Sequence, residues 1–446
     1  MNAKKTSQYV CQQCGAIRPK WAGRCENCGE WNSLSEQLTT SGTTSAKSAG
    51  QPLNVATMTE IKPLGTAERI TTGIAEVDQV LGGGLVPASV NLIAGEPGIG
   101  KSTLILQIAN KAAAQQRVLY VSGEESAEQV RMRANRLGAA ADKLAVVSST
   151  STDDIVATLE SGAYDLVIVD SIQTMTTSVI SSSAGSVSQI TNSTQLLISA
   201  AKNTNTAMII VGHVTKQGNI AGPKLLEHLV DVVLNLEGDR YGGFKVLRGI
   251  KNRYGSTNEA GIFEMQDDGL QPVDNPSAAL LAERQVSDGS VVLATMEGTR
   301  PLLVEVQALV NSTSFGYPKR TASGLDLNRL NLLIAMLSKR TKLKLDDKDV
   351  FVNVVGGLRI TEPAADLAVC MAVASAAKGL QLKDDAVVFG EVGLSGEVRH
   401  VSQPEKRIAE ARKLGFKAAI GPRLKKQQSF VHSVSTVRDA LNSYLA

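Results

Sequence analysis

A glycine-rich stretch in the first quarter of the chain has the residue types and the spacing to hold phosphate groups. It fits the pattern G-x-x-x-x-G-K-[ST] at every fixed position. Its residues are Gly95, Glu96, Pro97, Gly98, Ile99, Gly100, Lys101, Ser102 and Thr103. Glycines let backbone N–H groups close around phosphate oxygens, and the N-terminus of a following helix adds positive potential. Lys101 would reach the β- and γ-phosphates and Ser102 would ligate Mg²⁺, so the stretch predicts binding of ATP with Mg²⁺.

The segments on either side of this P-loop supply the context that it needs. Residues 89–94 are apolar enough for a buried strand, and residues 104–109 indicate a helix. A chance glycine-rich turn is the alternative interpretation. Such a turn has no reason to lie between a buried strand and a helix, so the flanking segments favour the phosphate-binding loop.

Two carboxylates further along are placed to complete the chemistry. Asp170 ends the apolar run 166–170, and a carboxylate at the C-terminal end of a buried strand can hold Mg²⁺ through water. Glu124 and Glu125 follow another apolar run, and we expect Glu124 to polarise an attacking water as a catalytic residue. The alternative for both glutamates is a charge pair that the dipole of a following helix favours.

Alternating strand and helix signals around these residues predict an α/β fold with a mostly parallel, doubly wound sheet. The expected strands are 118–122, 144–147, 166–170 and 207–211, and the expected helices are 127–137 and 152–160. Residues 174–194, rich in Ser, Thr and Gly, and residues 213–225 are expected to be surface loops. His213 ends a strand, where it could sense the γ-phosphate or could be structural.

Four of the five cysteines lie in the first 28 residues as two Cys-x-x-Cys-Gly turns. The pairs Cys11 and Cys14, and Cys25 and Cys28, have the spacing of two metal-binding knuckles that share one tetrahedral Zn²⁺. A redox pair is the alternative, which the duplication disfavours. Trp21 and Trp31 flank the second pair, and we expect them to cap the small core of this zinc finger.

Composition describes an ordinary globular protein. The 446 residues are 43% hydrophobic and 20% charged, with a net charge of +3 that permits a local basic surface but does not demand one. No segment has the pattern of a signal peptide or of a membrane span, and we therefore expect a cytoplasmic protein without a membrane partner.

Together with the motif Lys251-Asn252-Arg253-Tyr254-Gly255, these features resemble the bacterial RadA (Sms) DNA repair ATPases. The resemblance covers nearly the whole chain, and the ATPase core also resembles RecA and DnaB-type helicases. It implies that Glu124 activates water and that Lys251 and Arg253 act in trans on the nucleotide of a neighbouring subunit. Without the resemblance, the 251–253 segment would be interpreted as a solvated charge cluster.

The C-terminal third resembles the proteolytic domain of Lon peptidases, through residues 356–366 and 390–399. Those peptidases carry a nucleophilic serine where this chain has Ala364, and alanine cannot attack a carbonyl, so we expect no peptidase activity. Their partner lysine corresponds to Lys406 in this interpretation. The region would serve as an assembly scaffold, and its basic stretches at 339–348 and 423–426 are either solvated faces or DNA-binding surfaces.

The expected domains are a four-cysteine zinc finger (1–34), a flexible linker (35–60), a RecA-like P-loop ATPase domain (61–275) and an α+β Lon-protease-like scaffold (285–446). The resemblance implies a DNA-dependent ATPase of recombinational repair that assembles as a hexameric ring. It would act on single-stranded and branched DNA with the RecA recombinase. A nucleotide-switched DNA-binding adaptor without motor activity and a KaiC-like autokinase are the alternatives.

Overall fold

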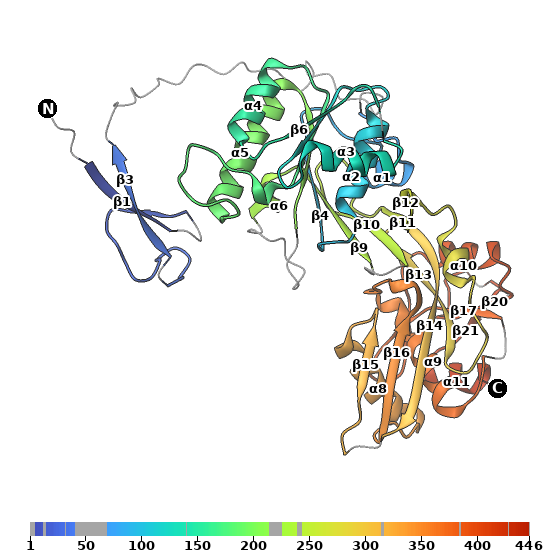
Figure 1. The fold of residues 1–446 in the computed structure, drawn as a ribbon. Coiled ribbons are helices and arrows are strands. Elements are labelled where there is room, and N and C mark those ends of the chain that lie inside the picture. The colour runs from blue at the N-terminus through green and yellow to red at the C-terminus, as the bar shows by residue number, and fades with distance from the viewer. Residues whose placement is uncertain are drawn as a thin grey trace. The chain divides into compact units, whose positions relative to one another are not determined.

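The computed structural model describes residues 5–11, 15–31, 33–40, 69–139, 141–213, 225–238, 243–313, 316–382, 385–426 and 428–445 (Figure 1). The chain groups into two compact units. Unit 1 is Met1–Leu236 with Gly249–Ser256 and Asp267–Gly269, and unit 2 is Glu237–Arg248, Thr257–Gln266 and Leu270–Ala446. In the described part of the chain, no helix combines the length and apolarity that crossing a membrane requires.

The N-terminal ribbon is a three-stranded antiparallel sheet in the order β2-β1-β3. Its strands are β1 (Lys5–Cys11), β2 (Ile17–Arg18) and β3 (Leu34–Thr40). The prediction that the two tryptophans cap its core is wrong, because Trp21 is 58% exposed and Trp31 is 68% exposed. The buried core is instead Cys11, Cys25 and Leu34, and a module this small has no interior left for two indole rings.

A nine-stranded sheet carries the P-loop, in the order β12-β11-β10-β9-β4-β8-β7-β5-β6. Every pair from β9 to β6 is parallel, and β10 pairs with β11 antiparallel, so the predicted mostly parallel sheet is confirmed. The strands are β4 (Val90–Gly95), β5 (Val118–Ser122), β6 (Leu144–Ser148), β7 (Leu166–Asp170), β8 (Ala207–Val211), β9 (Val232–Gly238), β10 (Phe244–Asn252), β11 (Ala260–Gln266) and β12 (Gly269–Pro272).

Helices cover both faces of the parallel part of this sheet, as a doubly wound fold requires. They are α1 (Ala75–Leu81), α2 (Lys101–Ala112), α3 (Ala127–Arg136), α4 (Thr152–Ser161), α5 (Val187–Thr204) and α6 (Leu225–Leu229), with the 3-10 turn η2 (Ile172–Thr174). Leu119 and Val121 of β5 pack in one core cluster with α4 and α5. Tyr120 lies between them in a strand, so its side chain points to the opposite face, where α2 contacts β4, β5 and β7.

The prediction of a loop over 174–194 is wrong for residues 187–194, because α5 begins at Val187. Ser186 caps the helix by accepting a hydrogen bond from the N–H of Gln189. Inside the helix, Thr194 donates its hydroxyl to the Ile190 carbonyl, so polar side chains that suggest a loop are satisfied within the helix. Of the predicted loop 213–225, residues 214–224 lie outside the described residues.

Unit 2 is built on a mixed seven-stranded sheet in the order β15-β16-β14-β13-β17-β20-β21. Its strands are β13 (Ser290–Glu297), β14 (Arg300–Ser312), β15 (Arg320–Ser323), β16 (Lys348–Val354), β17 (Ala386–Val388), β20 (Ala418–Gly421) and β21 (Val431–Ser433), beside a small pair, β18 (Glu391–Val392) and β19 (Val398–Arg399). Its helices are α7 (Pro276–Leu281), α8 (Leu327–Thr341), α9 (Asp366–Lys378), α10 (Pro404–Lys413) and α11 (Val437–Tyr444), with the 3-10 turns η3 (Val355–Gly357) and η4 (Pro363–Ala365).

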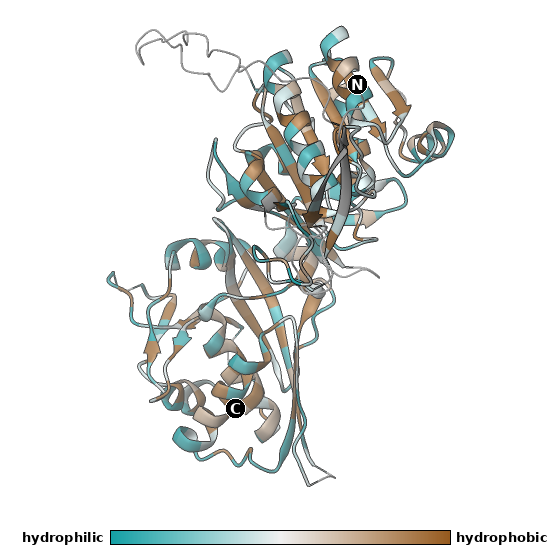
Figure 2. Cartoon of the chain, turned by 90° about the vertical axis from the view of Figure 1, so that its left-hand side faces the viewer, coloured by the Kyte–Doolittle hydropathy of each residue, from teal (hydrophilic) through white to brown (hydrophobic). Residues whose placement is uncertain are grey.

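Alternation along β13 explains how unit 2 buries both faces of its sheet. Val291 and Leu293 pack in one core cluster with α8, α9 and α11. Val292 packs in a second cluster with residues of α10. In Figure 2 the strands are mainly brown, which marks hydrophobic residues, and the helices carry both teal and brown residues. The predicted domain limits remain predictions.

Candidate nucleotide site

The P-loop has the strand–loop–helix context predicted for it, since β4 ends at Gly95 and α2 begins at Lys101. Gly98 and Gly100 have φ angles of 80° and 111°, in the region that favours glycine. Gly95 is also needed for space, because a Cβ there would lie 2.6 Å from the Leu236 carbonyl oxygen of β9. The loop therefore turns tightly enough to direct its backbone N–H groups inward.

Lys101 lies inside this loop with its side chain almost fully buried. Its Nζ donates hydrogen bonds to the carbonyl oxygens of Gly95 (2.8 Å) and Glu96 (2.9 Å). Burial lowers the pKa of Lys101 to about 8, and the nearby carboxylates of Asp170, Glu124 and Glu96 oppose that shift. The ammonium group is thus poorly solvated, which makes phosphate oxygens strong competitors for it.

The two predicted carboxylates meet at the same edge of the sheet. In the β5–β7 register Ser122 lies opposite Asp170, and the N–H of Gly123 donates to the Asp170 carbonyl at 2.7 Å. Ser171 donates its hydroxyl to Glu124 at 2.6 Å, and His213 Nε2 lies 3.6 Å from the same Glu124 oxygen. The structure therefore brings Glu124, Asp170 and Lys101 together, as the sequence predicts, although their roles remain predictions.

A buried polar chain behind Asp170 was missed by sequence reasoning. The hydroxyl of Tyr120, which has no exposed surface, donates to Asp170 Oδ2 at 2.8 Å. Arg133 of α3 donates to the same hydroxyl at 3.3 Å and pairs with Glu125 at 2.9 Å. Burial and the Asp170 charge raise the pKa of Tyr120, so it stays a proton donor. The available signal was a tyrosine in an aliphatic strand, since a buried phenol needs a hydrogen-bond partner.

Lys251 and Arg253 lie at the opposite edge of the sheet. Asp231 donates its N–H to the Val90 carbonyl at 2.9 Å and accepts the Val90 N–H at 3.0 Å, so it marks the start of β4. Arg253 pairs with this Asp231 at 2.9 Å. From Val90 to Gly95, at about 3.3 Å per residue, is about 16 Å, so these cations do not contact the P-loop of their own chain.

Both cations are held by their own chain. Lys251 Nζ donates to the carbonyl oxygens of Glu227 (2.7 Å), Val230 (2.7 Å) and His228 (3.3 Å), at the end of α6. Burial and the neighbouring Arg253 charge lower the pKa of Lys251. The guanidinium of Arg253 remains about half exposed, at 52%, although one edge is bound to Asp231. Its free edge can therefore meet a group on another molecule.

Arg69 and the Leu81 carbonyl, just before the triple-glycine turn at 82–84, hold the segment that carries these cations. Arg69 donates to the carbonyl oxygens of Tyr254 (2.8 Å) and Leu81 (3.1 Å). Asn252 donates to the same Leu81 carbonyl at 3.3 Å. A Cβ on Gly84 would lie 2.6 Å from the Ile70 carbonyl oxygen, so this turn needs glycine to fit.

Three thiols of the ribbon converge on one point. The Sγ atoms of Cys11, Cys25 and Cys28 lie within 4.8 Å of one another, and Cys14 lies outside the described residues. Cys11 and Cys28 are 3.6 Å apart, close to the roughly 3.8 Å between sulfurs in a tetrahedral site with Zn–S bonds of about 2.3 Å. The thiol set fits a zinc ion, and Gly15 and Gly29 take the positive φ of metal knuckles.

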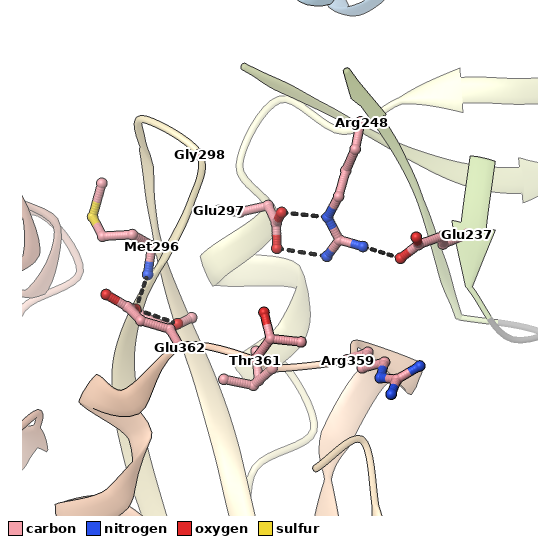
Figure 3. Close-up of a pocket in the computed structure, with 10 residues that line it drawn as sticks. Glu237, Arg248, Met296, Glu297, Gly298, Arg359, Thr361 and Glu362 are labelled. Atoms are coloured by element: carbon pink, nitrogen blue, oxygen red, sulfur yellow. Dashed lines mark hydrogen bonds and ion pairs between the residues drawn. The ribbon is translucent and has the colours of Figure 1, made fainter. Parts of the chain in front are cut away.

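The two positions that correspond to the Lon-type dyad do not form a serine–lysine pair in unit 2. Ala364 is buried in η4, and Lys406 donates instead to the Thr299 carbonyl at 3.0 Å. The adjacent cavity of about 350 Å³ is lined by Glu237, Arg248, Thr295, Met296, Glu297, Gly298, Arg359, Ile360, Thr361 and Glu362. Figure 3 shows Arg248 between Glu297 and Glu237, and its guanidinium forms an ion pair with each of these carboxylates. Neither serine nor cysteine lines this described cavity.

Taken with the sheet order, the P-loop edge defines a P-loop ATPase with a RecA-like α/β fold. Comparison with known families agrees: residues 57–219 match the family described as "AAA domain". Residues 9–36 match "Rubredoxin metal binding domain", and residues 331–425 match "Subunit ChlI of Mg-chelatase". The last match covers much of the region in which the sequence resembles Lon peptidases.

Relatives extend over almost the whole chain. "DNA repair protein RadA" of Halalkalibacterium halodurans is 47% identical and covers 98% of both chains. The proteins of the same name from Pseudomonas aeruginosa and Bacillus subtilis are 49% and 47% identical, and each alignment covers 94% of this chain and 93% of the relative. The chain therefore belongs to the DNA repair protein RadA family, as the sequence resemblance indicates.

Proposed function

We propose that this protein is a DNA-dependent ATPase of recombinational DNA repair. It uses ATP hydrolysis to move on single-stranded DNA and to promote branch migration of intermediates made by RecA. One observation carries the proposal: the phosphate-binding residues lie where β4 ends, and Lys251 and Arg253 lie near the point where β4 begins. A chain arranged this way completes its site with a neighbour, as ring-shaped motors do, and we propose a hexameric ring in the cytoplasm.

The proposed division of roles follows the contacts at the two edges. The P-loop residues 95–103 hold the phosphates of ATP, with Lys101 moving from the Gly95 and Glu96 carbonyls to phosphate oxygens. Glu124 orients the attacking water, and Asp170 with Ser102 would hold Mg²⁺, which neutralises charge on the transferring phosphoryl group. Arg253 and Lys251 of the neighbouring subunit stabilise the developing charge.

The ribbon adds a structural metal site to this motor. Cys11, Cys14, Cys25 and Cys28 would hold Zn²⁺, which stabilises a module whose hydrophobic core is too small to fold alone. The unit 2 sheet serves as a scaffold for assembly, since Ala364 supplies no nucleophile.

The experiment that tests the proposal measures ATP hydrolysis with and without single-stranded DNA, together with branch migration of a labelled joint molecule. We expect DNA to stimulate hydrolysis and Lys101→Ala to abolish both activities. A non-motor adaptor would keep its DNA activity after Lys101→Ala. An autokinase would transfer labelled γ-phosphate to its own chain without stimulation by DNA.

A further inference from the structure

We propose that Tyr120, Arg133 and Glu125 form a brace that positions Asp170 and the Glu124 loop as one unit for Mg²⁺–ATP. The proposal rests on the proposed function of this edge. The three are positioning residues, because none of them reaches the P-loop itself. Sequence motifs assign roles to Asp170 and Glu124, but they assign none to the residues behind them.

The hydrogen bonds of the brace run in one direction. Arg133 donates to the Tyr120 hydroxyl, and that hydroxyl donates to Asp170 Oδ2. Within the described residues Asp170 Oδ1 accepts no hydrogen bond. The brace therefore fixes Oδ2 and leaves Oδ1 for a water molecule that Mg²⁺ would bind. A carboxylate held in this way is oriented before the metal arrives, as outer-shell partners orient ligands in metal sites generally.

The other end of the brace reaches the loop that carries Glu124. Glu125 pairs with Arg133, and its N–H donates to Ser122 Oγ at 3.0 Å. Ser126 then begins α3 with a capping box, so the loop and the helix that carries Arg133 are fixed to each other. Gly123 completes the fit, since a Cβ there would lie 2.1 Å from Thr174 Oγ1.

The two carboxylates are therefore linked twice. On the solvent side Ser171, the residue after Asp170, donates directly to Glu124. The second link runs from the buried Tyr120 through Arg133 to the partly exposed Glu125. A displacement of Asp170 cannot leave Glu124 in place, so the metal ligand and the water-orienting residue move together.

A purely structural brace makes a different prediction from a positioning one. A buried phenol that merely needs a partner would lose folding stability when its oxygen is removed, with no change in metal dependence. A positioning brace changes how much Mg²⁺ is needed to bind nucleotide. Tyr120→Phe removes one oxygen atom without opening a cavity, so it separates the two roles.

The test measures the Mg²⁺ concentration that half-saturates binding of a fluorescent ATP analogue to the full-length protein. Tyr120→Phe and Arg133→Met should each raise this concentration about tenfold, which is the size of effect expected for outer-shell partners. Because the contacts lie in series, the double variant should also show about a tenfold rise. Arg131→Met is the matched control, since Arg131 lies on the same helix and its side chain contacts Asn135.

The brace is overturned if Tyr120→Phe and Arg133→Met need no more Mg²⁺ for half-saturation than Arg131→Met does, while circular dichroism shows that all three variants are folded. Additive effects in the double variant would also overturn the series arrangement. The titration requires neither DNA nor turnover, so it separates the brace from the proposed motor. Lack of DNA-stimulated hydrolysis in the wild type would reject the motor, and the Mg²⁺ titration would still decide the brace.

Discussion

The parallel sheet has a carboxyl edge, where its strands end beside the P-loop, and an amino edge, where β4 begins beside Asp231. The charged groups at these two edges bind different partners. At the carboxyl edge, Lys101 is buried among backbone carbonyls and near three carboxylates, where an anionic group such as phosphate would match its charge. At the amino edge, Lys251 and Arg253 are already satisfied by helix carbonyls and by Asp231, and Arg253 stays half exposed. One edge is built to receive a ligand, and the other is built to present cations outward.

With the proposed function, the difference between the two edges would make hydrolysis depend on assembly. An isolated chain holds the phosphate-binding loop and the metal-side carboxylates, but its Lys251 and Arg253 lie about 16 Å away along β4. In the proposed site, the cations that stabilise transition-state charge on the γ-phosphoryl group would be complete only when another chain presents its amino edge.

The largest expected effect comes from the carboxyl edge. Lys101→Ala should reduce ATP turnover to background, because the transferring phosphoryl group loses the cation that lies beside it. Hydrolysis is measured by phosphate release with saturating single-stranded DNA. Turnover that persists near the wild-type rate would mean that the P-loop does not hold the hydrolysed nucleotide.

Removing the cation at the amino edge should have the next largest effect. Arg253→Ala should lower DNA-stimulated hydrolysis by about 10³-fold, the scale of an arginine supplied in trans, and leave ATP binding nearly unchanged. Arg117→Ala is the matched control: Arg117 is 55% exposed, pairs with Asp165 at 3.5 Å and precedes β5 at the same edge. A large loss of ATP affinity in Arg253→Ala would place its side chain in its own site.

Mixing the two inactive variants tests whether the edges belong to one site. When equal amounts of Lys101→Ala and Arg253→Ala subunits assemble at random, about a quarter of the interfaces combine an intact Lys101 with an intact Arg253. Turnover should therefore recover to a measurable fraction of the wild-type rate. Mixtures that stay as inactive as either variant alone would show that each chain completes its own site.

The sequence predicted the carboxyl edge better than the amino edge, for a physical reason. The P-loop is a continuous segment, and buried aliphatic runs such as 166–170 end at the residues that do chemistry, so local patterns suffice. Asp231, which precedes β9, holds Arg253, which follows β10, and Arg133 reaches Tyr120 from a neighbouring helix. Contacts between side chains far apart in sequence leave no periodic signal.

The same limit explains the predictions that were wrong. The sequence predicts that Trp21 and Trp31 cap the small core, because so short a module needs extra support, but the core consists of cysteines and Leu34 and both indoles are exposed. Serines and threonines at 186–194 suggested a loop, although a serine cap and back-bonded hydroxyls begin a helix there. In the first case the small interior overrode a residue preference, and in the second case local hydrogen bonds did.

A pH dependence specific to the carboxyl edge should be smaller. The pKa of Lys101 is lowered to about 8 without nucleotide, and bound phosphates would raise it again. Above pH 8 the free protein must take up a proton to bind, so ATP affinity should fall by at most about tenfold per pH unit. Titration calorimetry in buffers of different ionisation enthalpy would detect this proton uptake. Proton release on ATP binding would contradict the role of Lys101 as the group that takes up the proton.

Loss of the ribbon's metal should have the smallest effect on either edge. Cys25→Ser combined with Cys28→Ser removes two of the converging thiols, so the ribbon should lose zinc and its folded structure. Its core contains Cys11, Cys25 and Leu34, and the parallel sheet has a separate core of its own. We therefore expect ATP binding within about twofold of the wild type. Metal analysis and ATP titration of the same sample check both parts: retained zinc would reject the four-cysteine site, and lost ATP binding would show that the ribbon supports the P-loop edge.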